Sequence, residues 1–256
     1  MKIIAFSNQK GGVGKTSTCV NVAAFMAKKG KKTLLVDMDP QGNTTTGVGF
    51  NKGELEVSVY NVLIEGASPK ECILHTGIEN LDLLPSSIEL AGAEVELVYL
   101  KSREKKLAAA LEAIKGEYDY IAIDCPPSLG LLTINALAAS DSVVIPIQSE
   151  YYALEGLTQL MNTIKLVVKV LNPKLEIEGV VITMYDGRAL VSKQIAAEIH
   201  KYFGKKTFDT VVPRNIRVSE APSHGVPVML HDPKCSGAKA YESLTDEILR
   251  RNGDFE

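Results

Sequence analysis

The chain has 256 residues, of which 45% are hydrophobic and 23% are charged, and its formal net charge is −3. This composition is typical of a folded globular protein. Because the net charge is negative, the chain cannot bind nucleic acid through a high overall positive charge, and any such binding needs a local basic patch. No apolar run approaches the ~18 residues of a membrane span. The four cysteines form no C-x-x-C pair, and we expect free thiols and no signal peptide.

Strand-like segments rich in Ile, Val and Leu alternate with helical patterns along the chain. The first strand is expected at residues 2–8, followed by a helix that Gly30 would end as a C-cap. Continuous apolar strands separated by helices indicate a parallel sheet covered on both faces. We therefore expect an α/β fold, doubly wound, with a mostly parallel sheet and helices on both faces, as a single domain over residues 1–256. The other strands are expected at 32–39, 80–86, 118–126, 142–148, 178–184 and 209–213.

A glycine-rich loop, NQKGGVGKTS (8–17), separates the first strand from the first helix. Gly14, Lys15 and Thr16 match the second half of the phosphate-loop pattern G-x-x-x-x-G-K-[ST], but Gln9 replaces its first glycine and Lys10 is an additional lysine. Such glycines let backbone N–H groups approach phosphate oxygens, and the helix N-terminus adds positive potential. Lys15 is expected to bridge the β- and γ-phosphates, and the Thr16 hydroxyl to bind Mg²⁺. The expected nucleotide-binding residues are Gly11, Gly12, Val13, Gly14, Lys15, Thr16 and Ser17.

Two acidic motifs end other expected strands. In VDMDPQGN (36–43), the period of two places Asp37 and Asp39 on the same face of the strand. Asp37 could equally cap the following turn or act in the site, whereas Asp39, at the carboxyl end, is favoured for function. In IAIDCPPS (121–128), Asp124 ends an apolar strand and, combined with the phosphate loop, is expected to hold Mg²⁺ through water. Ligands of such sheets bind beyond the carboxyl ends of the strands, where all three motifs are expected.

Together these motifs resemble the ParA/Soj family of chromosome- and plasmid-partitioning ATPases, within the deviant Walker A group of P-loop NTPases. The resemblance covers about residues 2–245. The loop alone marks only the wider group, whereas the VPRN-x-R-x-SEAPSHG pattern is much more specific to the partitioning branch. The matching stretches are KGGVGKT (10–16), DMDPQGN (37–43), DCPPSLGLLTINAL (124–137), YYALEG (151–156) and VPRNIRVSEAPSHG (212–225).

The resemblance implies a site that uses ATP/ADP and Mg²⁺ and is shared by two subunits. It implies that Lys10 crosses the interface of an ATP-sandwich homodimer to contact the partner's phosphates, and that Gly11 lies at that interface. Asp39 occupies the position that orients the attacking water. Taken alone, the residues favour an ordinary turn at Pro213 and Asn215, and only the resemblance implies that these two contact adenine. The implied catalytic residues are Lys10, Lys15, Asp39 and Asp124, and the implied Mg²⁺ site comprises Thr16, Asp39 and Asp124.

The resemblance also implies partners. The ATP-bound homodimer would bind double-stranded DNA nonspecifically. Its slow ATP hydrolysis would be stimulated by DNA and by a DNA-bound ParB/Spo0J-like partition protein. The protein would be cytoplasmic and associated with the nucleoid. Arg188 and Arg217 best match the family's DNA-contacting arginines. Lys193 and Lys201 are further candidates, although lysines on a helix face are often simply solvated. Because the chain starts at the first strand, we expect no N-terminal helix-turn-helix domain, as in the smaller chromosomal type.

Three alternative functions each require a particular sequence feature. A membrane-cycling ATPase of the same group, which positions the division site, would need a basic amphipathic helix at the C-terminus. The C-terminal stretch ESLTDEILRRNGDFE carries acidic residues throughout. We therefore expect no membrane binding. A carrier of a metal cluster would need cysteines presented across a dimer, and Cys125 is better explained as a buried thiol. A nucleotide-switched binding module without hydrolysis is disfavoured by the presence of Asp39.

Overall fold

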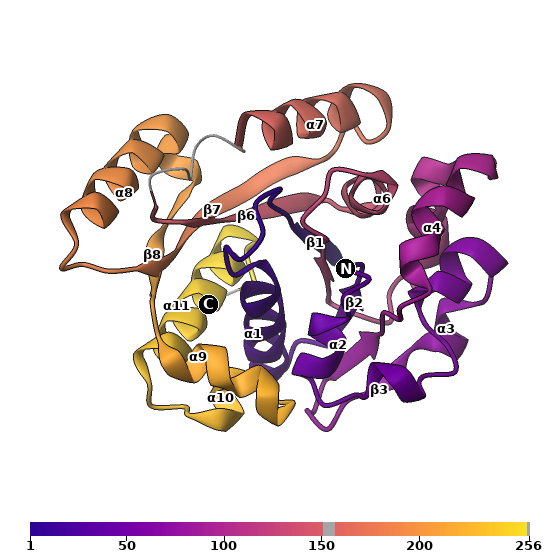
Figure 1. Ribbon diagram of the computed structural model, residues 1–256, viewed down its shortest axis with the longest axis horizontal. Coiled ribbons are helices and arrows are strands. Elements are labelled where there is room, and N and C mark those ends of the chain that lie inside the picture. The colour runs from indigo at the N-terminus through magenta and orange to yellow at the C-terminus, as the bar shows by residue number, and fades with distance from the viewer. Residues whose placement is uncertain (151–156, 255–256) are drawn as a thin grey trace.

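A computed structural model describes residues 1–150 and 157–254 (Figure 1). Its centre is an eight-stranded sheet with the order β3-β4-β2-β5-β1-β6-β7-β8. All neighbouring strands pair in parallel except β3, which is antiparallel to β4. The strands are β1 (Lys2–Phe6), β2 (Thr33–Asp37), β3 (Leu74–His75), β4 (Leu81–Leu84), β5 (Tyr120–Asp124), β6 (Ser142–Gln148), β7 (Glu176–Tyr185) and β8 (Thr207–Pro213).

Helices cover both faces of this sheet (Figure 1). One buried apolar cluster joins the sheet to α1 and α11, and a second joins it to α4, α5, α6, α7 and α8. Both faces of the strands are therefore apolar, which explains their continuous hydrophobic runs. The helices are α1 (Lys15–Lys28), α2 (Asn43–Gly47), α3 (Pro69–Cys72), α4 (Leu90–Glu96), α5 (Lys106–Glu112), α6 (Leu131–Ala139), α7 (Leu157–Val170), α8 (Leu190–Phe203), α9 (Ile216–Glu220), α10 (Val228–His231) and α11 (Ser236–Arg251).

The expected fold class is confirmed, and each expected strand overlaps an observed one. Gly30 has φ 82° two residues beyond the end of α1, the left-handed conformation expected after a helix. Strand β3 was not predicted, because two residues are too short to show a pattern. The stretch YYALEG (151–156) lies outside the described residues.

The register of the central strands brings the sequence motifs to one edge. Phe6 at the end of β1 is level with Asp124 at the end of β5, and Asp124 is level with Asp37 at the end of β2. The loops that follow these three strands therefore start side by side. This edge is where a ligand of a doubly wound sheet is expected to bind.

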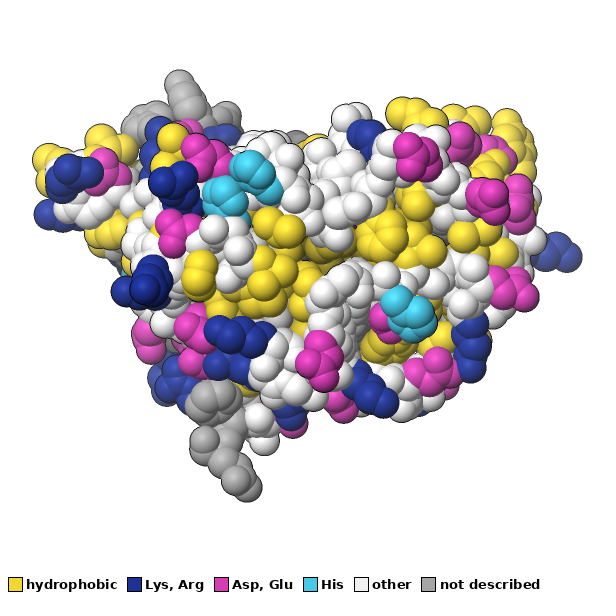
Figure 2. All heavy atoms as spheres, turned by 90° about the horizontal axis from the view of Figure 1, so that it is seen from below, with side chains coloured by type: hydrophobic (Ala, Val, Ile, Leu, Met, Phe, Trp, Pro, Cys, Tyr) yellow, Lys and Arg dark blue, Asp and Glu magenta, His cyan; other side chains and the backbone are white. Residues whose placement is uncertain are grey.

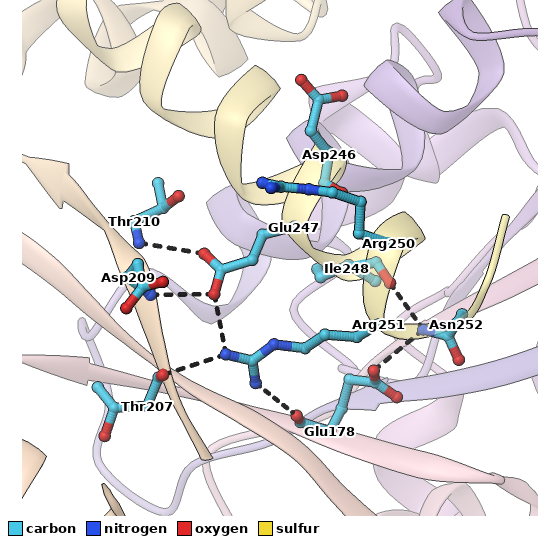
Figure 3. A network of polar contacts seen from close by, with 10 residues as sticks. All are labelled: Glu178, Thr207, Asp209, Thr210, Asp246, Glu247, Ile248, Arg250, Arg251 and Asn252. Carbon is cyan, nitrogen blue, oxygen red and sulfur yellow. Dashed lines mark hydrogen bonds and ion pairs between the residues drawn. The ribbon is translucent and has the colours of Figure 1, made fainter. Parts of the chain in front are cut away.

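The C-terminal helix α11 is anchored to β7 and β8 by the polar network in Figure 3. The Arg251 guanidinium donates to the carbonyl oxygens of Glu178 and Thr207, both at 3.1 Å, and to Glu247 Oε1 at 2.8 Å. The Glu247 carboxylate also accepts hydrogen bonds from two backbone amides of β8. Because the apolar side of α11 packs on α1 and the sheet, this helix is part of the core. No helix in the described part of the chain is long and apolar enough to span a membrane.

Candidate nucleotide-binding site

The loop between β1 and α1 has the backbone geometry of an anion cradle. Gly12 and Gly14 have φ of 74° and 82°, a region that favours glycine. Gly14 precedes α1 and cannot cap it with a side chain, which leaves the amides of the first turn available to an anion. The Asn8 side chain braces the loop, since it donates to the Pro146 carbonyl oxygen (2.7 Å) and accepts from the Lys10 amide (3.0 Å).

Lys15 is a buried cation beneath this loop. Its Nζ donates to the carbonyl oxygen of Lys10 at 3.1 Å. Burial lowers the pKa of Lys15, and the nearby carboxylates of Asp124 and Asp39 act in the opposite direction. A buried ammonium of this kind gains strongly from an anion placed beside it.

Asp124 is fully buried at the end of β5. Its Oδ2 accepts a hydrogen bond from the Thr44 hydroxyl at 2.8 Å, while its Oδ1 has no hydrogen-bond partner. Burial raises the pKa of Asp124 to about 6, although the Thr44 hydrogen bond, the nearby Thr16 hydroxyl and the Lys15 ammonium act in the opposite direction. A buried carboxylate oxygen without a partner, close to a threonine hydroxyl, fits the oxygen ligands that Mg²⁺ prefers.

The two aspartates of VDMDPQGN have different surroundings. Asp37 accepts hydrogen bonds from the Thr45 amide (2.8 Å), the Thr45 hydroxyl (2.7 Å) and the Asp39 amide (3.2 Å). Of the two roles left open for Asp37, the structure shows the local one, because these contacts hold α2 against β2. Asp39 is also buried, and its Oδ1 accepts from the Gln41 amide at 2.9 Å. It lies close enough to Lys15 and Asp124 to raise the pKa of both.

A cavity of about 370 Å³ opens beside Gly14 at the start of α1. Ser17 of α1 and Tyr241 of α11 form one part of its lining, and Pro213 and Asn215 form another. Asn215 Oδ1 caps α9 by accepting an amide hydrogen bond at 2.9 Å. A cavity that adjoins the phosphate loop has the position required for the nucleoside part of a nucleotide.

Comparisons with known proteins decide the family. Residues 1–177 match a family described as AAA domain. Over 247 residues the chain is 59% identical to the sporulation initiation inhibitor protein Soj of Bacillus subtilis, which covers 96% of this chain and 98% of that protein. It is 50% identical over 251 residues to the chromosome partitioning protein ParA of Myxococcus xanthus, covering 98% of this chain and 89% of that protein. This chain belongs to the ParA/Soj family of chromosome-partitioning ATPases.

The fold of one solved structure matches the fold of this chain over almost the whole length of both chains. It is described as cobyrinic acid a,c-diamide synthase from Mycobacterium smegmatis with a bound ATP analogue and magnesium. The two chains are 36% identical with a TM-score of 0.88, and the match covers 99% of this chain and 96% of that one. The expected family and the P-loop fold are thus both confirmed.

In this ParA/Soj family member, the additional lysine of the loop has a partner that sequence reasoning missed. Lys10 Nζ lies 3.6 Å from Glu150 Oε2, just beyond the end of β6. The other oxygen of Glu150 lies 3.9 Å from Arg214 Nη2. Gly11 is exposed, and a Cβ added there would have no atom within 4 Å. The only sequence signal for Glu150 was an acid that follows a buried strand, which is common in folds of this type.

The four DNA-binding candidates fall on one loop and two helices. Arg188 is almost fully exposed in the connection between β7 and α8, and Lys193 and Lys201 are exposed on α8 itself. Arg217 lies on α9, where it forms ion pairs of 2.9 and 3.6 Å with two acidic side chains. Their role in DNA binding stays a prediction. For the rival metal-cluster function, Cys125 is fully buried, and burial raises the pKa of its thiol.

Proposed function

We propose that this chain hydrolyses ATP to ADP and phosphate as the switch of a chromosome or plasmid partitioning system. The observation that carries the proposal is the buried Lys15–Asp124 arrangement beneath the glycine loop, with one Asp124 oxygen unpartnered. Its cofactors are ATP/ADP and Mg²⁺, and the similar chain from M. smegmatis holds an ATP analogue and magnesium. The single domain over residues 1–256 would form one nucleotide site per subunit.

Each residue of the site has a part in this reaction. The amides of residues 11–17 and the Lys15 ammonium bind the phosphates, and the cavity beside Pro213 and Asn215 receives the nucleoside. Thr16, Asp124 and Asp39 would hold Mg²⁺, which would neutralise charge on the transferring phosphoryl group. Asp39, which lies close enough to Lys15 and Asp124 to affect the pKa of both, would also orient the attacking water, the role that the family resemblance implies.

The subunit completes its site by forming a homodimer. Lys10 leaves Glu150 and reaches the phosphates bound by the partner subunit, while the open surface at Gly11 allows the two loops to approach. An exposed ion pair contributes only about 0–1 kcal/mol, so its loss is a small cost. A positive charge supplied in trans, as an arginine finger is, can increase the rate by ~10³–10⁵.

The ATP-bound dimer binds double-stranded DNA nonspecifically at the nucleoid, in the cytoplasm. Arg188, Lys193, Lys201 and Arg217 would contact backbone phosphates, which gives affinity without sequence choice and a steep dependence on salt. A ParB/Spo0J-like partition protein on DNA then stimulates hydrolysis and resets the switch. The membrane-cycling alternative is not favoured, because the apolar face of α11 is buried against α1 and the sheet.

The test is phosphate release by the chain alone, with DNA, and with DNA plus the candidate partition protein. We expect slow hydrolysis alone and the highest rate with both additions. The Asp39→Ala variant is the control for contaminating ATPases, since it keeps the loop that binds nucleotide. No hydrolysis under any of the three conditions would overturn the proposal.

A further inference from the structure

Charges of both signs are mixed on the face of the molecule that carries α9 and α10. Figure 2, which views this face, shows lysine and arginine side chains interspersed with acidic ones, and the whole chain has a formal net charge of −3. Such a surface is expected to exert little long-range attraction on an anion. The direction of each amide in the phosphate loop therefore matters for phosphate binding, because these dipoles act at short range.

Two threonine hydroxyls hold consecutive carbonyl oxygens at the end of this loop. Thr183 Oγ1, near the carboxyl end of β7, donates to the Val13 carbonyl oxygen at 2.8 Å. Thr18 Oγ1, on α1, donates to the Gly14 carbonyl oxygen at 2.7 Å. The C=O and N–H of a trans peptide point in opposite directions, so the amides of Gly14 and Lys15 point away from the two hydroxyls.

The two hydroxyls are not equivalent. The Gly14 carbonyl oxygen also accepts the Thr18 amide at 2.9 Å, so the backbone of α1 holds it even without the hydroxyl. No backbone amide in residues 1–150 and 157–254 donates to the Val13 carbonyl oxygen. The hydrogen bond that holds the Val13–Gly14 peptide therefore comes from one side chain of a strand that is distant in the sequence.

Thr183 is fixed in this position by its surroundings. It is 1% exposed, and it pairs with Gln148 in the register of β6 and β7. Its own carbonyl oxygen accepts the Ser149 amide at 3.3 Å. A Cβ added to Gly14 would lie 3.8 Å from the Thr183 Cβ, so the threonine side chain packs directly against the loop. The hydroxyl is therefore a donor with a defined direction.

The backbone that follows Thr183 is strained. Met184 has φ 50°, in the left-handed region that is unfavourable for residues other than glycine. Such a conformation persists where the surrounding structure determines it, and it is concentrated at functional sites. Thr183 and Met184 both line the cavity beside Gly14. The hydrogen bond to the loop and the strained turn thus both connect this end of β7 to the candidate nucleotide site.

We propose that Thr183 is a positioning residue for ATP, whose hydroxyl turns the Val13–Gly14 peptide so that the Gly14 amide faces the phosphates. This inference rests on the proposed function and adds a residue to that site. Because the hydroxyl proton is already donated to Val13, Thr183 acts through the loop and does not contact the transferred phosphoryl group. Loss of the hydroxyl should therefore weaken phosphate binding and leave the hydrolysis of bound ATP unchanged.

Calorimetry with ATP and Mg²⁺ tests this inference. Thr183→Val keeps the shape of the side chain but cannot donate a hydrogen bond, and we expect its ATP affinity to fall about tenfold. Its KM should rise by a similar factor, while kcat stays within about threefold. Thr183→Ser restores the donor and should bind ATP within about threefold of the unchanged chain. If the valine variant does not fold, Thr183→Ala replaces it, because alanine and serine differ only in the hydroxyl.

Thr33→Val is the matched control. Thr33 is fully buried at the amino end of β2, and its Oγ1 donates to the Lys31 carbonyl oxygen at 2.9 Å. This variant loses the same kind of hydrogen bond at the edge of the sheet opposite the phosphate loop. It should bind ATP normally. Equal weakening in Thr33→Val and Thr183→Val would indicate a general loss of stability and would overturn the inference.

Inorganic triphosphate separates positioning of the loop from contact with the nucleoside, since Thr183 also lines the cavity. In competition with labelled ATP, the affinity of Thr183→Val for triphosphate should fall by the same factor as its affinity for ATP. A loss for ATP alone would assign Thr183 to the nucleoside and overturn the inference, as would full retention of ATP affinity. No ATP binding by the unchanged chain would overturn the proposed function itself, and this inference with it.

Discussion

Lys10 of the phosphate loop and Glu150 form an ion pair, with Nζ and Oε2 3.6 Å apart. The lysine comes from the phosphate loop and the glutamate from the segment after β6. Both side chains are partly exposed, so the pair is a weak resting position for the lysine. If Lys10 acts on a partner subunit, this contact must break during each cycle.

Replacing Lys10 or Glu150 distinguishes two explanations: either the Lys10 charge itself is needed for turnover, or the ion pair is. Lys10→Ala should still bind ATP through Lys15 but lose ATP-dependent dimerisation and turnover. Glu150→Gln removes the same ion pair yet keeps the lysine, so its turnover should stay within about threefold of the unchanged chain. Calorimetry, light scattering and phosphate release measure the three properties. A Glu150→Gln variant as inactive as Lys10→Ala would show that the ion pair itself is what matters.

Gly11→Val should leave the subunit folded and able to bind ATP, but monomeric. The site of the new side chain is open, and Gly11 does not have the positive φ that would strain a valine. The added bulk would instead obstruct a second subunit. Light scattering with ATP is the readout. The comparison is Gly14→Val, which should weaken ATP binding itself, because φ of 82° disfavours any side chain there. A dimeric Gly11→Val variant would contradict the placement of this glycine at the interface.

Asp37 and Asp39 should respond differently to alanine. Asp37→Ala leaves the buried Thr45 amide and hydroxyl without their acceptor, and we expect a loss of about 2–4 kcal/mol in the free energy of unfolding. Asp39→Ala should cost much less, bind ATP, dimerise and fail to hydrolyse. Urea unfolding and phosphate release provide the two measurements. Normal stability of Asp37→Ala would show that its hydrogen bonds contribute little to the fold.

The raised pKa of Asp124 predicts a pH dependence of stability. The carboxyl holds its proton more tightly in the folded chain, with a pKa of about 6 against an ordinary 3.8. The contribution of Asp124 to the free energy of unfolding is therefore complete at a pH below the ordinary pKa and is lost as the pH rises through about 6. Burial raises the pKa of Asp37 to about 7, in the same direction.

Without nucleotide or Mg²⁺, Asp124→Asn should reduce the fall in unfolding free energy between about pH 4 and pH 7 by on the order of 1–3 kcal/mol. Urea titrations of both proteins across this range measure the difference, which includes the effect of the Asp124 charge on the pKa of Asp37. Parallel curves for the two proteins would mean that Asp124 titrates normally in the folded chain.

The sequence was most informative where the physical signal is local. Continuous apolar runs separated by helical patterns predicted the strands, and parallel pairing required Asp37 and Asp124 to meet at one edge. The role of Asp37 could not be decided, because it depends on where α2 places Thr45. The Lys10–Glu150 contact joins residues far apart in the chain and has no motif.

In the proposed dimer each site is completed by Lys10 of the other subunit, and mixing two inactive variants tests this. Lys10→Ala keeps its own Asp39 but supplies no lysine, whereas Asp39→Ala supplies the lysine but cannot hydrolyse. In a mixed dimer, the Lys10→Ala subunit has its own Asp39 and receives Lys10 from its partner, so one site is complete.

The measurement is phosphate release from an equimolar mixture of the two variants, compared with each variant alone. We expect turnover well above the sum of the separate rates, and this turnover should rise with protein concentration as dimers form. If Lys10 acts within its own subunit, no site in the mixture is complete. A mixture no more active than its components, under conditions where light scattering shows dimers, would contradict the completion of each site by the partner's lysine.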